Sequence, residues 1–299
     1  MACQCGNDFV DVKTSINGEW LCSHCFEDYV MEEIFDETKD KIICGDCLVE
    51  MKNIPDKSID MILADLPYGT TACKWDTIIP FEPLWKQYKR IIKDNGAIVL
   101  TASQPFTSAL VMSNPDMFRE SIVWLKNKSG SGLQADQKHI KVHEDILIFS
   151  LNGSYTFNPQ KTSIDKKEFL TQRKTFNEVE VGNTIYSKMT KKQTADNGTR
   201  NPISIVSYKV PHNPSISKKY DRMNNDIREH PTQKPIELFA YLIKTYTNKG
   251  DLVLDNVAGS GTTGVACKML GRNYILIEKE KEYCDIAEQR IKAISNPLF

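Results

Sequence analysis

The sequence lacks any long apolar run. No stretch of its 299 residues approaches the ~20 consecutive apolar residues of a membrane-spanning helix, and the amino terminus has no signal-peptide core. It also lacks an excess of charge, because 38 Lys and Arg oppose 39 Asp and Glu. Internal repeats and low-complexity tracts are absent too. We therefore expect a cytoplasmic protein with no membrane partner, in which any surface for nucleic acid is local.

The cysteines are few and unevenly placed. Nine cysteines, an odd number without an export signal, favour a reducing compartment over a disulfide framework. Two close pairs, C-x-C and C-x-x-C, lie in the first 25 residues: Cys3, Cys5, Cys22 and Cys25. Four thiolates in two pairs suit tetrahedral zinc, which would stabilise a module too small for its own core. The spacing predicts structural zinc in a module over residues 1–35, with four unrelated reduced cysteines as the alternative.

A short polar and aromatic motif follows one apolar segment. Ile59–Ala64 predicts a buried parallel strand, and Asp65-Leu66-Pro67-Tyr68 comes directly after it. Open α/β sheets bind their ligands at the carboxyl ends of strands. An Asp, a Pro with a free carbonyl and an aromatic face can hold an exocyclic amine by two acceptors and stack on its ring. For this tetrapeptide alone, a plain turn after a strand is the alternative.

A second motif lies near the other end of the chain. The apolar segment 251–255 ends in Asp255, and glycines 259, 261 and 264 then fit the spacing G-x-G-x-x-G before a helix over Val265–Leu270. The next predicted strand, 274–277, ends at Glu278, which is placed to bind ribose hydroxyls. This order of strand, glycine loop, helix, strand and acid predicts a nucleotide-binding site.

The acid before the glycine loop narrows the choice of nucleotide. Asp255 would bring a carboxylate close to the pyrophosphate of a dinucleotide such as NAD. No Lys follows the glycines, which argues against a P-loop. S-adenosylmethionine carries a sulfonium, an ammonium and no phosphate, so an acidic strand end suits it. The predicted cofactor is S-adenosylmethionine.

Together the two motifs resemble those of amino-methylating DNA methyltransferases, in the circularly permuted order where the catalytic motif precedes the cofactor loop. The resemblance runs from about residue 41 to 294. It includes four further segments: Ile42–Cys47, Ser103–Phe106, His143–Phe149 and His230–Pro235. Leu66 departs from the commoner second Pro, and Asn256-Val257 stands where Pro-Phe is common. Neither departure removes a polar group that the chemistry needs.

The resemblance implies a role for each motif residue. Asp65 and the carbonyl of Leu66 or Pro67 would accept the amine hydrogens of a flipped-out base, while Tyr68 stacks on its ring. Asp46 would contact the adenine of the cofactor. The full implied set of cofactor-binding residues is Asp46, Asp65, Thr232, Lys234, Asp255, Ala258, Gly259, Gly261, Thr262 and Glu278.

Asp65 favours adenine N6 as the methylated atom, because cytosine-amine enzymes of the group more often have Ser at this position. Cytosine N4 remains an alternative, whereas the absence of a Pro-Cys pair argues against methylation of a cytosine ring carbon. Methylation of RNA or of a protein amide is disfavoured by the motif order. An inactive, zinc-bearing DNA-binding module is disfavoured by the intact acids at 46, 65, 255 and 278.

The alternation of strands and helices predicts an α/β, Rossmann-like methyltransferase fold with a mostly parallel sheet. Strands are expected at about 41–44, 59–64, 97–101, 120–125, 145–150, 251–254 and 274–277, and helices at 82–93, 236–247 and 280–292. The expected divisions are the zinc module, a catalytic half over 36–155, a target-recognition insertion over 156–226 and a cofactor-binding half over 227–299.

The insertion carries the local charge that the whole chain lacks. From Lys161 to Arg222 there are thirteen Lys or Arg against six Asp or Glu, an excess of seven. Such a surface suits contacts with the phosphates and base edges of double-stranded DNA, and a solvated loop is the alternative. The expected partner is double-stranded DNA. A homodimer and a cognate restriction endonuclease are left open by the resemblance.

Overall fold

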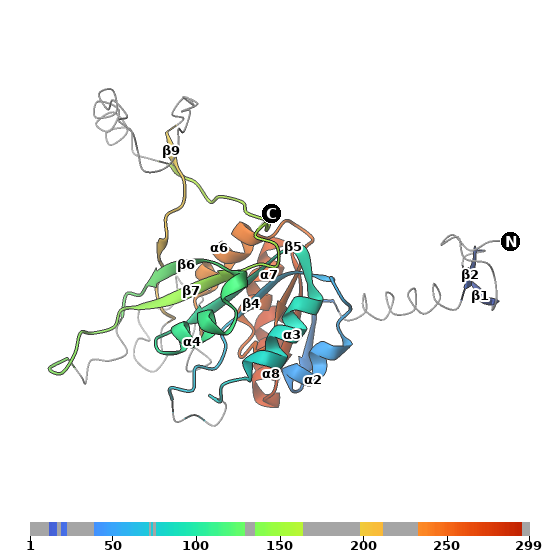
Figure 1. Ribbon diagram of the computed structural model, residues 1–299, viewed down its shortest axis with the longest axis horizontal. Coiled ribbons are helices and arrows are strands. Elements are labelled where there is room, and N and C mark those ends of the chain that lie inside the picture. The colour runs from blue at the N-terminus through green and yellow to red at the C-terminus, as the bar shows by residue number, and fades with distance from the viewer. Residues whose placement is uncertain are drawn as a thin grey trace.

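The computed structural model describes residues 39–71, 73, 76–128, 135–163, 198–211 and 233–294, and the backbone alone of 12–16 and 19–22. Its centre is an eight-stranded sheet in the order β10-β6-β7-β5-β4-β11-β12-β3 (Figure 1). The strands are β3 (Lys41–Cys44), β4 (Ile59–Ala64), β5 (Ile92–Ala102), β6 (Phe118–Leu125), β7 (His143–Phe149), β10 (Ile205–Ser207), β11 (Leu252–Asp255) and β12 (Asn273–Glu278). Only β7 runs antiparallel to its neighbours, β5 and β6, within this sheet. The predicted α/β fold with a mostly parallel sheet is confirmed.

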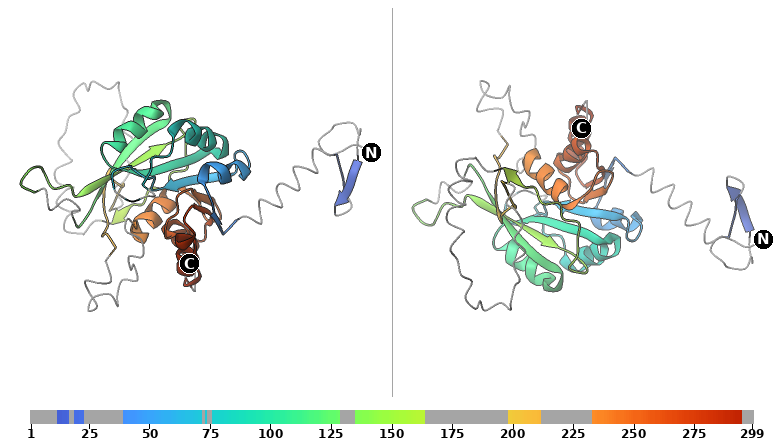
Figure 2. Two further views of the ribbon diagram at one scale, coloured as in Figure 1. Left: turned by 90° about the horizontal axis from the view of Figure 1, so that it is seen from below. Right: turned by 90° about the horizontal axis from the view of Figure 1, so that it is seen from above.

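Helices cover both faces of the sheet, as the two views in Figure 2 show. One face holds α2 (Cys47–Glu50), α3 (Phe81–Ile91) and α4 (Phe106–Ser113), and the other holds α6 (Ile236–Tyr246), α7 (Thr262–Leu270) and α8 (Lys281–Lys292). Alternate side chains of a strand point to opposite faces. In β4, Ile62 accordingly joins the core beneath α3, while Met61 and Leu63 join the core beneath α6 and α7.

Helix α3 shows how the sequence pattern produces this packing. Leu84, Trp85, Tyr88 and Ile91 form its buried stripe, spaced by three to four residues as one helical face requires. We predicted that this helix would run to Lys93, but it ends at Ile91 because β5 begins at the next residue. Strand β5 has eleven residues and is longer than predicted. The helices α2 and α4, together with the 3₁₀ turns η1 (Met51–Asn53) and η2 (Pro115–Met117), were not predicted, since each is too short for a clear periodicity.

Part of the predicted insertion belongs to the sheet itself. Strand β10 lies at its edge, parallel to β6, and the short strands β8 (Thr162–Ser163) and β9 (Thr199–Arg200) pair with each other. Near the amino terminus, β1 (Val12–Ile16) and β2 (Glu19–Cys22) form an antiparallel hairpin. The predicted ligands Cys3, Cys5 and Cys25 lie outside the described residues, and only the backbone of Cys22 is described. The zinc site therefore stays a prediction.

The parallel strands bring the motifs to one edge of the sheet. Strand β4 pairs with β11, β11 with β12 and β12 with β3, all in the same direction. Their carboxyl ends therefore gather Asp65, Asp255, Glu278 and Asp46 along one edge, although these residues come from distant parts of the chain. Among the described residues, no helix is long and apolar enough to cross a membrane.

Candidate active site

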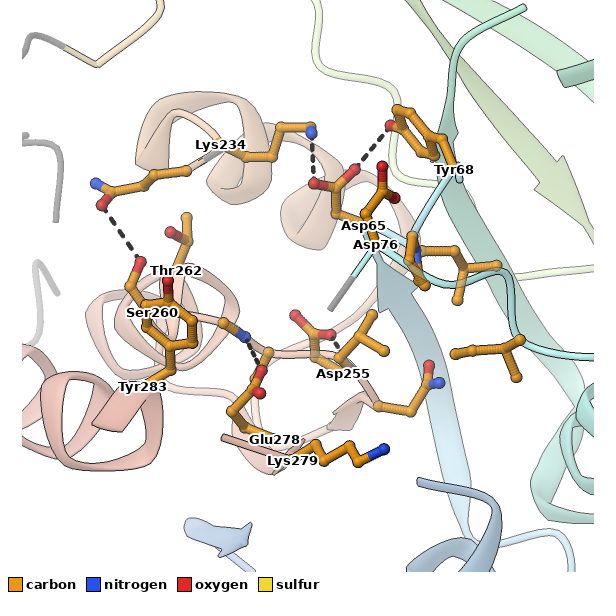
Figure 3. A pocket seen from close by; sticks show the side chains of 18 of the residues that line it. Asp65, Tyr68, Asp76, Lys234, Asp255, Ser260, Thr262, Glu278, Lys279 and Tyr283 are labelled. Carbon is orange, nitrogen blue, oxygen red and sulfur yellow. Dashed lines mark hydrogen bonds and ion pairs between the residues drawn. The ribbon is translucent and has the colours of Figure 1, made fainter. Parts of the chain in front are cut away.

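A pocket of about 870 Å³ opens at this edge of the sheet (Figure 3). Most of the predicted site residues line it: Asp46, Asp65, Leu66, Pro67, Tyr68, Lys234, Asp255, Ala258, Gly259, Thr262 and Glu278. Gly261 is not among the lining residues, and Thr232 lies outside the described part of the chain. The fold thus brings the catalytic and the cofactor motifs to a single pocket.

The carboxylate of Asp65 is held by three side chains. Its Oδ1 accepts hydrogen bonds from the hydroxyl of Tyr68, at 2.7 Å, and from the hydroxyl of Thr101 on β5. Its Oδ2 lies 2.5 Å from Nζ of Lys234. Burial, together with the charges of Asp65 and Glu144, raises the pKa of Tyr68 well above its usual value, so the phenol remains a donor. These contacts fix the direction in which the carboxylate points.

The ring of Tyr68 has a defined orientation as well. It stacks on Phe106 with a centroid distance of 5.3 Å and an interplanar angle of 28°. The ammonium of Lys234 lies 5.7 Å from the centroid of the Tyr68 ring, within the range of a cation–π contact. The aromatic ring and the carboxylate are therefore presented to the pocket as one rigid unit.

The loop after the catalytic motif is held by Asp76. This buried carboxylate accepts hydrogen bonds from the backbone N–H groups of Gly69, Thr70 and Thr71, at 2.9, 2.9 and 2.6 Å. Burial opposes the charged form, but the hydrogen bonds from the side chain of Thr71 and from the three backbone N–H groups outweigh burial and lower the pKa of Asp76. The ionised carboxylate thus closes the loop that leaves β4.

The cofactor side of the pocket is acidic. Asp255 is 3% exposed and accepts hydrogen bonds from the hydroxyl of Thr263, at 2.5 Å, and from the N–H of Val257, at 3.1 Å. Burial raises its pKa to about 7, and the charges of Asp65 and Glu278 add to the shift. A buried acid beside other carboxylates is stabilised in its ionised form by a cation. This side of the pocket therefore suits a positively charged ligand.

Glu278 and Asp46 organise the backbone around the same region. Glu278 accepts the N–H of Gly259 through Oε2 and the N–H of Glu280 through Oε1, each at 2.8 Å. Asp46 caps α2 by accepting the N–H of Leu48 at 2.9 Å. Both carboxylates line the pocket at the ends of neighbouring strands, where they can accept hydrogen bonds from a ligand's hydroxyl or amino groups.

The backbone conformation and the packing at position 261 require a glycine. Its φ is +77°, and a Cβ at this position would lie 2.6 Å from Cβ of Ala287 in α8. A Cβ on Gly264 would lie 2.5 Å from Cδ1 of Ile291. Both glycines therefore allow α8 to pack closely against the loop and α7.

Several residues of the site were missed by the sequence analysis. Thr101 is the one polar residue of the buried segment 97–102 of β5, and a polar residue in an apolar run is the kind of signal that could have indicated its role. Glu144 belongs to a recognised motif but was given no role. Asp76 lies in a loop without a pattern. Asn256, noted as a departure, is buried and accepts a hydrogen bond from the hydroxyl of Tyr88 in α3 at 2.6 Å.

Comparison with known proteins matches the chain to a family. The family model N6_N4_Mtase, described as DNA methylase, matches residues 59–289. The chain is 30% identical over 269 residues to the DNA adenine methyltransferase YhdJ of Escherichia coli, covering 85% of the chain and 83% of YhdJ. It is 26% identical over 267 residues to the type II methyltransferase M.HpaI of Haemophilus parainfluenzae, covering 86% and 75%.

Solved structures share the fold. The complex of M1.HpyAVI with SAM, S-adenosylmethionine, aligns with a TM-score of 0.53 at 24% identity and covers 84% of the chain and 98% of that protein. The cytosine-N4-specific PvuII DNA methyltransferase aligns with a TM-score of 0.57 at 15% identity, covering 86% and 87%. At these identities the likeness concerns the fold.

Proposed function

The chain belongs to the N6_N4_Mtase family of DNA methylases, and we propose that it transfers a methyl group from S-adenosylmethionine to the exocyclic amine N6 of adenine in duplex DNA. The observation that carries this proposal is the carboxylate of Asp65. It lies at the end of β4, fixed by Tyr68, Thr101 and Lys234, in the same pocket as the acidic ends of β11 and β12.

The pocket fits S-adenosylmethionine by charge. Asp255, with its pKa raised to about 7, is suited to a cationic group, and Glu278 is placed to accept hydrogen bonds from ribose hydroxyls. Asp46 and the carboxyl end of β12 offer polar groups for the adenine ring. When bound, S-adenosylmethionine supplies a methyl group that its sulfonium has already activated. The protein is then required to bring an amine into line with that methyl group.

Asp65 and its neighbours would orient the amine. An ionised carboxylate only accepts hydrogen bonds, so Asp65 would take one hydrogen of the amine, and the carbonyl of Leu66 or Pro67 would take the other. The nitrogen lone pair is then directed toward the cofactor side. Tyr68, already stacked on Phe106 by one face, would support the ring of the base. No covalent enzyme intermediate is required.

The target base must leave the DNA duplex to reach this site. Flipping a base out of its stack costs a few kcal/mol, which contacts in the pocket have to offset. On the side away from the cofactor motifs, the pocket is lined by Ser103, Trp124, Lys126 and Pro211. We therefore place the flipped base between Asp65 and this wall, and the duplex beyond it, toward the edge strand β10.

Adenine is favoured over cytosine by Asp65 and by the similarity to YhdJ, a DNA adenine methyltransferase. The experiment is to express the protein in a host that lacks DNA methylation and to analyse the nucleosides of digested plasmid DNA. N6-methyladenine in one sequence context is the expected product. N4-methylcytosine would confirm a DNA amino methyltransferase but show that its target base is cytosine. Unmodified DNA from cells with folded protein would refute the proposal.

The order of the motifs supports a circularly permuted arrangement. The catalytic motif, in the half over 36–155, precedes the cofactor loop, in the half over 227–299, and both halves contribute strands to the same sheet. Two relatives are named type II methyltransferases, which supports a cognate restriction endonuclease for this chain as well. A homodimer remains a further proposal, and sedimentation of the purified protein with and without DNA would test it.

The amino-terminal cysteines are proposed to bind one structural zinc ion. The support beyond the cysteine spacing is the β1–β2 hairpin, in which Val12 pairs with Cys22. In the sequence, Cys3 and Cys5 precede this hairpin and Cys25 follows it. The module over residues 1–35 would then be held by the metal and contribute no group to methyl transfer.

A further inference from the structure

Four side chains of alternating charge form a row along the wall of the pocket. Asp65, after β4, contacts Lys234, which lies just before α6, and Nζ of Lys234 lies 3.5 Å from Oε2 of Glu144 on β7. The other oxygen of Glu144 pairs with Lys126, just after β6. Figure 3 shows the amine of Lys234 directed at Asp65. Four separate segments of the chain thus converge on one row of charges.

Lys234 depends on both of its acidic neighbours. It is only 7% exposed, and a buried ammonium is strongly disfavoured unless opposite charges surround it. Once the carboxylate of Asp65 also binds the target amine, it neutralises the ammonium of Lys234 less completely, and the ammonium then needs a second negative charge nearby. Glu144 supplies that charge. Its Oε2 is buried and, among the described residues, has no hydrogen-bond partner, so it acts on Lys234 through charge at 3.5 Å.

We propose that Glu144 is a positioning residue for methyl transfer, which keeps Lys234 charged and directed at Asp65 so that Asp65 presents a fixed acceptor to the target amine. This inference rests on the proposed function. Glu144 acts through Lys234, and Lys126 in turn holds Glu144 in place. The row of charges therefore links the catalytic carboxylate to β6 and β7, which lie toward the proposed DNA side.

The direction of each pKa agrees with this arrangement. Burial lowers the pKa of Lys234, but the attraction of Asp65 and Glu144 outweighs burial and raises it. Burial raises the pKa of Glu144, and the charges of Lys234 and Lys126 outweigh it and lower the pKa. Among the residues that the structure describes, the titratable groups in contact with Lys234 are Asp65, Glu144 and Tyr68. Removal of the charge on Glu144 should therefore lower the pKa of Lys234.

The test is the variant Glu144→Gln, which keeps the size of the side chain and removes its charge. Single-turnover methyl transfer at saturating cofactor and DNA should slow on the order of 10- to 100-fold, the equivalent of one charge-assisted interaction. The KM for DNA and the Kd for S-adenosylmethionine should stay within about twofold, because Glu144 binds neither directly. The alkaline limb of the rate against pH should move to lower pH, and Glu144→Asp should restore part of the rate.

The matched control is Glu120→Gln. Glu120 lies on β6, is half-buried and accepts hydrogen bonds from the hydroxyls of Tyr155 and Tyr246, but it does not line the pocket. This variant should keep the wild-type rate and pH profile. It controls for the general effect of neutralising a glutamate within the same sheet.

A double variant separates positioning from a structural role. If Glu144 acts through Lys234, then adding Glu144→Gln to Lys234→Met should slow the reaction no further than Lys234→Met alone. Additive losses, or a Glu144→Gln protein with the wild-type rate and pH profile, would overturn the inference. Failure of the wild-type protein to methylate DNA would instead overturn the proposed function, and unchanged binding of S-adenosylmethionine by calorimetry would show that the variants are folded.

Discussion

The ammonium of Lys234 lies 2.5 Å from Oδ2 of Asp65, although 169 positions separate the two residues. This ion pair joins the segment leading into α6 to the end of β4, and it is deeply buried on the lysine side. Removing one partner of a buried pair leaves an uncompensated charge, which typically costs about 3–5 kcal/mol. The end of β4 and the segment leading into α6 are therefore connected at the point where we propose that the reaction occurs.

Glu278→Gln should weaken the binding of S-adenosylmethionine about tenfold, since one hydrogen bond to a charged group contributes roughly 1.5–3 kcal/mol. The variant removes a charged acceptor from the end of β12, where Glu278 also accepts the N–H of Gly259. Calorimetry measures the change. Glu288→Gln, on the exposed side of α8, is the control and should bind as the wild type does. Equal affinities in both variants would remove Glu278 from the cofactor site.

Gly261→Ala should destabilise the fold more than Gly250→Ala. Both glycines have positive φ, +77° and +86°, so each alanine carries a backbone cost of about 1–2 kcal/mol. Only at Gly261 does the new Cβ collide with Ala287, and such overpacking adds roughly 1–3 kcal/mol. Urea unfolding of the two variants measures the difference. Equal urea midpoints for the two variants would mean that α8 can move away from residue 261 at no cost, which would contradict the close packing of Gly261 against Ala287.

The affinity for S-adenosylmethionine should rise with pH up to about 7 and then level off. Asp255 has a pKa raised to about 7 by burial, and a cationic ligand prefers its ionised form. Asp255→Asn should bind more weakly above pH 7 and lose this pH dependence. Titration calorimetry from pH 5.5 to 7.5 measures the affinity of both proteins. If the affinity changes with pH equally in the wild type and in Asp255→Asn, a group other than Asp255 causes the pH dependence.

The raised pKa of Asp255 also determines how the stability of the cofactor-free protein changes with pH. The pKa of Asp255 is about 7 in the folded state against 3.8 as its ordinary value, so between these values the folded protein holds a proton that the unfolded chain has lost. Asp255 therefore makes the cofactor-free protein less stable as the pH rises through this window. Asp255→Asn should raise the melting temperature at pH 7.5 by a few degrees and change it little at pH 4, which calorimetric scans would show.

The purified protein should contain one zinc ion per chain, held by Cys3, Cys5, Cys22 and Cys25. Metal analysis of protein never exposed to chelator tests this, and the variant Cys22→Ser should lose the metal. Deleting residues 1–35 should leave cofactor binding and methyl transfer at saturating DNA intact. Loss of catalysis in a truncated protein that folds and binds cofactor would make the module part of the active site.

The sequence predicted the central architecture well because its strongest signals are local. Apolar segments bounded by turns predicted strands over 59–64 and 251–254, which the structure has as Ile59–Ala64 and Leu252–Asp255, and the order of strand, glycine loop and acid predicted a nucleotide-binding site. The register of the sheet then determined which side chains meet. The parallel pairing of β4 with β11 cannot be predicted from either segment alone. This pairing places Asp65 beside Asp255.

The parts that the sequence missed depend on contacts between distant segments. Glu144 contacts Lys126 and Lys234 only because β7 runs antiparallel between β5 and β6, and no local pattern in the sequence indicates these contacts. Lys234, a predicted cofactor-binding residue, lines the pocket, and its contact with Asp65 was not predicted. Gly261 was predicted as a cofactor-binding residue of the glycine loop, and its close packing against Ala287, from a helix that follows it in the chain, was not predicted.

The most direct test of the account is methyl transfer by the purified protein and by Asp65→Ala, with labelled S-adenosylmethionine and duplex DNA, RNA and a protein mixture as acceptors. The wild type should label duplex DNA alone, at adenine N6. Asp65→Ala should keep its DNA binding largely intact but transfer at least about a hundredfold more slowly, because an interaction that orients the reacting amine is lost. Transfer by Asp65→Ala at nearly the wild-type rate, with its fold confirmed, would contradict the central role given to this carboxylate.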